Sequence, residues 1–111
     1  MRMLMDVIIP HEPFNTMTRE GVVSRKIADI LEALKPEAAY FTDQDGKRSA
    51  IIIVDLPDPS KIPALVEPWF LTFKADVKLR IVMTAEDLKN AGLESLGKKW
   101  AETGLQAASR V

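Results

Sequence analysis

Apolar patterns of strand and helix type follow one another along this chain in the order strand, helix, strand, strand, helix, strand. This order restricts the possible folds more than any other feature of the sequence. The first strand is predicted at residues 2–9, where every second residue is apolar. The last is predicted at residues 76–83, with one fully apolar side made by Val77, Leu79, Ile81 and Met83.

Two amphipathic helices are expected between the strands. The first covers residues 23–34 and ends at Lys35, because the proline that follows disfavours helical backbone there. Residues 11–15, which precede this helix, are expected to form a loop. The second helix follows Ser60, which can cap it. It contains Pro68, which removes a backbone hydrogen bond and is expected to kink the helix or divide it.

The two middle strands are expected to form a hairpin. Residues 38–42 and 48–55 flank the pair Asp45-Gly46, which can supply the positive φ angles of a tight turn. After the last strand, Thr84 with Asp87 predicts a capping box at the start of a helical tail. Glycines make this tail a poor helix by itself, so we expect it to pack on another surface. Its apolar residues are Leu88, Leu93, Leu96 and Trp100.

With right-handed crossovers, the order of elements predicts an α+β, ferredoxin-like βαββαβ sandwich. Its sheet has four antiparallel strands, with the first and third strands at the centre. At 111 residues the chain is expected to be a single domain, 1–111, with the ferredoxin-like core at 1–84 and the C-terminal helical tail at 85–111.

Two helices cover one face of such a sheet, and the apolar sides of the first and last strands make that face the natural one. The other face would expose Leu4, Ile8, Val82 and one apolar row of the third strand, either Ile51 and Ile53 or Ala50, Ile52 and Val54. So much apolar surface calls for a cover. A second copy of the sheet predicts a homodimer through this face, and the tail helix is the alternative cover.

Charge and composition exclude several kinds of protein. Fifteen basic and sixteen acidic residues give a net charge of -1 without a basic stripe, so no nucleic-acid partner is expected. With no cysteine and one histidine, we expect no metal site and no cofactor. The apolar run near the N-terminus carries Asp6 and lacks a cleavage site, so neither a signal peptide nor a membrane span is expected. These features favour a cytoplasmic protein.

Three stretches carry a resemblance to a known group: LKPEAAYFTDQDG at 34–46, EPWF at 67–70 and VMTAEDL at 82–88. Over roughly residues 1 to 88 the chain resembles a small family of uncharacterised bacterial proteins in the dimeric alpha-beta barrel group. The resemblance implies a ferredoxin-like protomer and a face-to-face dimer. It implies no reaction. The wider group includes cofactor-free monooxygenases, haem-degrading enzymes, muconolactone-isomerase-like enzymes and binding modules, and their catalytic residues have no match here.

His11 is the first candidate for an acid or base. It lies just beyond the first strand beside Glu12, which can orient it, and an imidazole changes charge near neutral pH. The alternative is an exposed loop residue without a role. Asn15 can hydrogen-bond a ligand, or it can cap a helical turn.

Four further residues are candidates for ligand binding. Trp69 and Phe70 follow Pro68, so one of them can line a gap between helix and sheet, and the alternative is that both pack in the core. Tyr40 can bond a ligand through its hydroxyl or simply occupy an edge strand. Arg80 can hold a carboxylate. Alternatively, Arg80 or Lys78 pairs with Asp6 across the strands at the dimer face.

Two functions remain in view. The first is a homodimeric small-molecule-binding or accessory module without a cofactor, since the sequence has no nucleophile paired with a base. The second is a cofactor-independent monooxygenase or isomerase acting on a small aromatic or polyketide-like substrate, with His11 as proton carrier and Trp69 as pocket wall. They differ in whether His11 lies at the mouth of a cavity that Trp69 lines. A purely structural dimer without a ligand is the third possibility.

Overall fold

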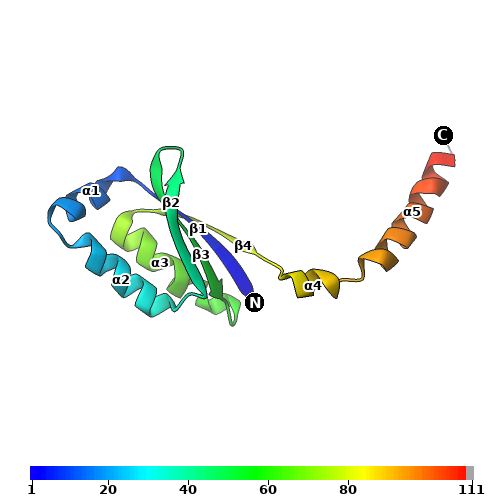
Figure 1. The fold of residues 1–111 in the computed structure, drawn as a ribbon, viewed down its shortest axis with the longest axis horizontal. Coiled ribbons are helices and arrows are strands. Elements are labelled where there is room, and N and C mark those ends of the chain that lie inside the picture. Colours follow the sequence, from blue (N-terminus) through cyan, green and yellow to red (C-terminus); the bar gives the residue numbers. More distant parts are fainter. Residues whose placement is uncertain (110–111) are drawn as a thin grey trace.

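The computed structural model describes the backbone of residues 1–109 and the side chains of residues 1–101 (Figure 1). Within this range the chain is α+β, with five α-helices, one 3-10 turn and a four-stranded antiparallel sheet. The strands are β1 (Arg2–Ile9), β2 (Ala38–Gln44), β3 (Lys47–Asp55) and β4 (Asp76–Ile81), in the order β2-β3-β1-β4. The predicted central position of the first and third strands is confirmed. Residues 110–111 of the predicted tail lie outside the described residues.

Period-two patterning decides which side of each strand is buried. Met5 on β1 lies opposite Ile52 on β3 and Leu79 on β4, and all three belong to the side covered by helices. The predicted hairpin is confirmed as well. Asp45 and Gly46 have φ angles of 52° and 78°, the positive values that a two-residue turn between twisted strands requires.

Three helices cover one face of the sheet, as Figure 1 shows. They are α1 (His11–Arg19), α2 (Val23–Leu34) and α3 (Ile62–Phe73). The loop predicted at residues 11–15 is wrong from Pro13 onward, because that part belongs to α1, whereas Glu12 keeps the non-helical backbone angles φ -114° and ψ 141°. The helix is stabilised by contacts that local propensity does not reveal, since Phe14 and Met17, three residues apart, pack against the core.

Helix α3 differs from prediction at its start, and of the two outcomes expected at Pro68 the division into two helices does not occur. A short 3-10 turn, η1 (Pro59–Lys61), precedes it and is capped by Asp58, whose Oδ1 accepts a bond of 2.9 Å from the backbone N of Ser60. The predicted cap by Ser60 is wrong, because the N-cap residue of α3 is Lys61, which makes no side-chain capping bond. The helix then runs through Pro68 without dividing. Leu65 and Trp69 are buried on its inner face, and this burial holds the helix together despite the missing hydrogen bond.

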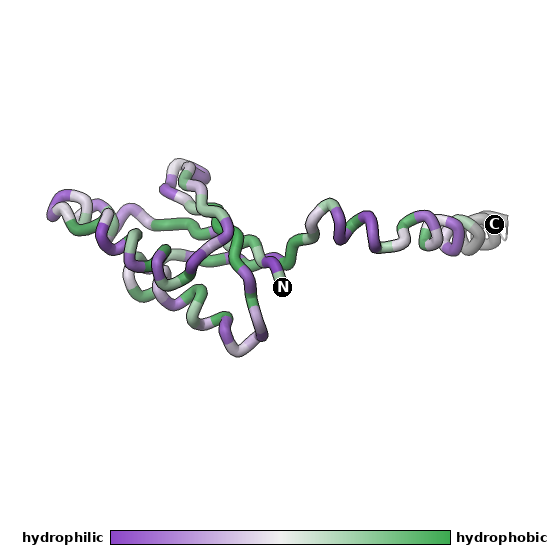
Figure 2. Tube along the Cα trace, turned by 60° about the horizontal axis from the view of Figure 1, so that its bottom comes forward, coloured by the Kyte–Doolittle hydropathy of each residue, from purple (hydrophilic) through white to green (hydrophobic). Residues whose placement is uncertain are grey.

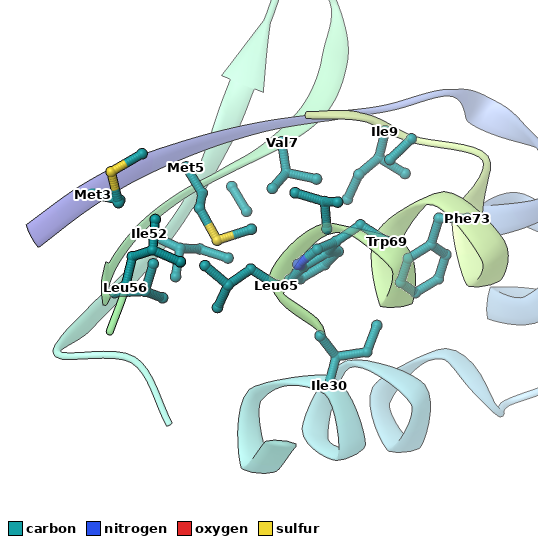
Figure 3. Close-up of a cluster of buried hydrophobic side chains, with 14 residues drawn as sticks. Met3, Met5, Val7, Ile9, Ile30, Ile52, Leu56, Leu65, Trp69 and Phe73 are labelled. Carbon is teal, nitrogen blue, oxygen red and sulfur yellow. The ribbon is translucent and has the colours of Figure 1, made fainter. Parts of the chain in front are cut away.

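The core lies between the sheet and α3, with α2 beside it (Figure 3). Its largest fully buried side chains are Trp69, Phe73, Met5, Ile9 and Ile52. On the opposite side of the sheet, which we call the open face, the apolar row from β3 is Ile51 and Ile53, because Ala50, Ile52 and Val54 are buried under the helices.

The C-terminal arm consists of α4 (Ala85–Lys89) and α5 (Leu93–Ser109) and leads away from the sheet (Figures 1 and 2). The predicted capping box is confirmed: Thr84 N donates to Asp87 Oδ2 at 2.9 Å, and Asp87 N donates to Thr84 Oγ1 at 3.1 Å. The described chain measures 68 Å along its longest axis but only 30 and 23 Å along the others. The arm therefore does not cover the open face.

Candidate functional site

A small apolar pocket lies between the helices and the hairpin end of the sheet. Its volume is about 180 Å³, and it is lined by Ile9, Phe14, Ile27, Phe41, Thr42, Arg48 and Ser49. Apolar cavities of about 150 Å³ are large enough to hold benzene. The pocket therefore has the size for a single substituted ring or a short branched chain.

The fold brings the pocket residues together from five elements. Ile9 ends β1, and Pro10 turns the chain into α1, which presents Phe14. Arg48 lies opposite Ile9 in the sheet and opposite Asp43 on the other side. The pocket thus forms where the first crossover leaves the sheet.

Arg48 is the one charged residue that lines this pocket. Its Nη1 donates a hydrogen bond of 2.8 Å to Asn15 Oδ1, and its guanidinium carbon lies 4.2 Å from the ring centroid of Phe14. Among the described residues it has no carboxylate within ion-pairing distance. A guanidinium has five N–H donors, so most of them remain available to a ligand.

Phe14 links the pocket to the core. Its ring centroid lies 5.2 Å from that of Phe73, and Phe73 in turn lies 6.1 Å from Trp69. Aromatic rings at these separations attract one another beyond simple burial. The wall of the pocket is therefore backed by rigid core side chains.

The His11 side chain is exposed at the start of α1 and does not line the pocket. The Glu12 carboxylate beside it is already engaged, because its Oε2 accepts bonds from Thr16 N at 3.2 Å and Thr16 Oγ1 at 2.7 Å. Arg19 adds an ion pair at 3.6 Å. The hydrogen bond from the Thr16 side chain is the largest cause that lowers the pKa of Glu12. Glu12 is thus committed to α1 and does not orient His11.

Of the other predicted site residues, the structure brings only Asn15 to this pocket, through its bond to Arg48 rather than as a helix cap. Trp69 is fully buried in the core, as the simpler interpretation expected, and does not line a gap. Phe70 and Tyr40 are exposed, Phe70 on α3 and Tyr40 on the open face. Arg80 is exposed on the open face as well.

Sequence reasoning missed Arg48. One signal was present in the sequence. Every second residue of β3 from 48 to 54 faces the helices, and Arg48 is the only charged member of that row. A cation in an otherwise apolar buried row needs a partner. Phe41 was missed because the sequence did not decide which side of the edge strand faces the helices.

A larger hollow of about 510 Å³ lies at the other end of the sheet, lined by Met1, Arg2, Lys35, Glu37, Val54 and Asp55. Its charges already pair with one another. Arg2 bonds both oxygens of Glu37 at 2.7 Å, and the Met1 ammonium lies 2.9 Å from Asp55 Oδ1. This hollow is a salt-bridged surface and a weaker candidate than the apolar pocket.

The predicted ion pair between Asp6 and Lys78 or Arg80 is not formed within the single chain. Asp6 lies directly opposite Lys78 in the register, yet Asp6 Oδ1 is buried without a hydrogen-bond partner. The side chains of Lys78 and Arg80 are exposed. Long basic side chains on a surface gain little from a single pair and keep their hydration instead.

Comparisons with known proteins do not assign the chain to a group: no family model matches it, and no curated protein does either. Over the described residues, the helices are too short or too polar to cross a membrane.

Proposed function

We propose that this protein is a homodimeric module of ferredoxin-like protomers that binds a small, mostly apolar molecule without a cofactor. The pocket beside Arg48 is the binding site, and the ligand carries a negative charge next to its apolar part. The observation that carries this proposal is a guanidinium in an apolar pocket with no carboxylate partner in the described chain.

Arg48 favours a carboxylate over a neutral ligand for two reasons. The apolar lining weakens competition from water, so a charge-assisted hydrogen bond is stronger there than on an open surface. Asn15 and the ring of Phe14 hold the guanidinium in place, so little side-chain freedom is lost when a ligand binds.

The open face supports the homodimer. Leu4, Ile8 and Ile53 are only partly buried there, and Ile51 and Tyr40 are exposed. A face that carries this much apolar surface favours association, and the two-fold pairing of identical sheets covers it on both copies at once. The arm, which was the alternative cover, extends elsewhere.

The arm also supports association. Four strands of six to nine residues give the open face a projected area of roughly 500 Å² at standard strand spacing. A standard interface buries about 800 Å² on each partner, so the face alone makes a small contact. Exposed residues of the arm offer the additional apolar area: Leu88, Leu93, Leu96 and Trp100.

The enzyme alternative receives no support from the site. His11 is exposed, Trp69 is fully buried, and neither lines the pocket or the larger hollow. The pairing of an acid-base residue with a cavity wall, on which that hypothesis depended, is therefore absent from the described part of the chain.

Sedimentation velocity at micromolar concentration tests the dimer. We expect a species of twice 12.4 kDa. A single species of 12.4 kDa would contradict the dimer and leave the pocket to be tested separately.

Binding of benzoate tests the pocket, since benzoate joins a ring of suitable size to a carboxylate. Titration followed by NMR shifts should give a dissociation constant on the order of 1 mM, as expected for so small a ligand. Benzamide, which has nearly the same shape without the charge, serves as the control and should bind at least tenfold more weakly. Equal binding of the two, or no shift at Phe14 and Phe41, would overturn the proposed site.

A further inference from the structure

We propose that Asp6 is the acceptor of an ion pair between subunits, with the basic residues Lys78 and Arg80 of a second copy as donors. This inference rests on the proposed homodimer and specifies how its two faces recognise each other. It starts from the one carboxylate oxygen that is buried and unsatisfied among the described side chains.

Asp6 lies on β1, one of the two central strands, and its side chain belongs to the open face. Leu4 and Ile8 flank it along the strand, and Ile51 lies opposite it on β3. These neighbours are apolar and have no side-chain hydrogen-bond donor to offer Oδ1. Buried polar atoms almost always have a partner, and a carboxylate without one is costly.

None of the described side chains of the same chain provides the missing donor. Lys78 lies opposite Asp6 on β4, but its exposed side chain makes no ion pair with it. Arg80, two residues further on the same face, makes none either. The open face therefore carries one unsatisfied acceptor beside two unpaired cations.

A second copy offers donors to the Asp6 carboxylate by symmetry. The side chain must turn for Oδ1 to meet them, because Oδ1 is buried in the single chain. When two identical faces meet about a two-fold axis, each contact occurs twice, so the acid of one copy can meet the bases of the other at both ends of the interface. An acid and two bases that do not pair within one face can therefore pair between two faces. Such a pair fixes the orientation of the sheets more than it adds net stability.

Charge reversal followed by mixing tests this directly. Asp6→Lys makes positions 6, 78 and 80 all basic, and the double variant Lys78→Glu/Arg80→Glu makes the same three positions all acidic. We expect each variant alone to be monomeric at micromolar concentration, because like charges then face each other across the interface. Mixed together, they should form a heterodimer, detected by native mass spectrometry from their different masses.

Mixing separates pairing between chains from pairing within one chain. Within each variant, positions 6, 78 and 80 carry charges of one sign, so only contacts across the interface can restore association. Asp43→Lys is the matched control, because Asp43 is exposed on β2 and belongs to the opposite side of the sheet. This control should remain a homodimer and should not rescue the double variant.

The outcomes distinguish this inference from the homodimer itself. A monomeric wild-type protein would contradict both. A wild-type dimer that persists in Asp6→Lys, or variants that stay monomeric when mixed, would contradict the ion pair alone. If circular dichroism shows that Asp6→Lys does not fold, Asp6→Asn replaces it, and we expect at least a tenfold weaker dimer. An unchanged dimer constant in Asp6→Asn would also overturn the inference.

Discussion

Arg48 on β3 and Asn15 on α1 are joined by a hydrogen bond of 2.8 Å, which ties the hairpin to the first crossover helix. The bond links residues 33 positions apart in sequence and holds the guanidinium over Phe14. These two contacts restrain the position of the Arg48 guanidinium in the pocket. The consequences for binding can be tested at Arg48.

Arg48→Met should weaken benzoate binding about 10- to 100-fold, the loss expected when a charge-assisted hydrogen bond is removed. Binding of benzamide should change much less, because the apolar lining stays in place. Both are measured by NMR titration. Lys47→Met, one residue earlier on the same strand and exposed, is the control and should leave both affinities unchanged. A parallel loss for both probes would indicate a collapsed pocket instead of a lost charge.

Leu4→Glu should abolish the dimer and lower its apparent thermal stability together, because a charge would replace apolar contact at the centre of the open face. Sedimentation velocity and thermal unfolding measure the two effects. Leu71→Glu is the matched control, since Leu71 is 80% exposed on α3 in the helix layer. If Leu4→Glu left both properties at their wild-type values, the open face would not be the interface.

Periodicity predicted most of the fold. The alternation of β1 identified its buried side, and Asp45-Gly46 identified the hairpin, because burial and backbone angles impose these patterns directly on the sequence. On β4 only Val77 and Leu79 pack on the core, and Ile81 and Met83 of the predicted apolar side are exposed. Helix α1 could not be predicted this way. Its stability depends on packing of Phe14 and Met17 against a core that exists only after folding.

The candidate site was less predictable, for a related reason. His11 and Trp69 were candidates because of their residue types, yet Trp69 is buried in the core and His11 is exposed. The role of Arg48 depends on its position, because the strand register places it opposite Ile9 at the pocket. Register was not available before the strands were paired.

The ion pair between Arg2 and Glu37 should make the free energy of unfolding depend on pH in the acidic range. Its hydrogen bond is the largest cause that lowers the pKa of Glu37 below the ordinary 4.5. A lowered folded-state pKa contributes stability above the unfolded value, and this contribution is lost as the pH falls through the folded value.

Glu37→Gln should therefore have a lower melting temperature than wild type at pH 7, and the difference should vanish once the pH has fallen below the folded-state pKa of Glu37, where both states are protonated. Because the pair is exposed, the difference should be small, a few degrees at most. Glu32→Gln, an exposed glutamate on α2, is the control and should show no such trend. A melting difference that stays constant with pH would contradict the assignment.

The double variant Leu96→Ser/Trp100→Ser tests whether the arm takes part in association. These two residues lie four apart on α5, on one side of the helix, and Trp100 is 61% exposed in the single chain. A helix that contains Gly97 and lies apart from the core gains little stability by itself, so its apolar side is expected to pack on the second copy. We expect the dimer constant to weaken at least tenfold, measured by sedimentation at several concentrations. Glu94→Ser/Lys98→Ser changes two polar residues of the same helix without altering net charge and should leave the constant unchanged. Equal constants for the apolar and polar variants would show that the arm stays outside the dimer.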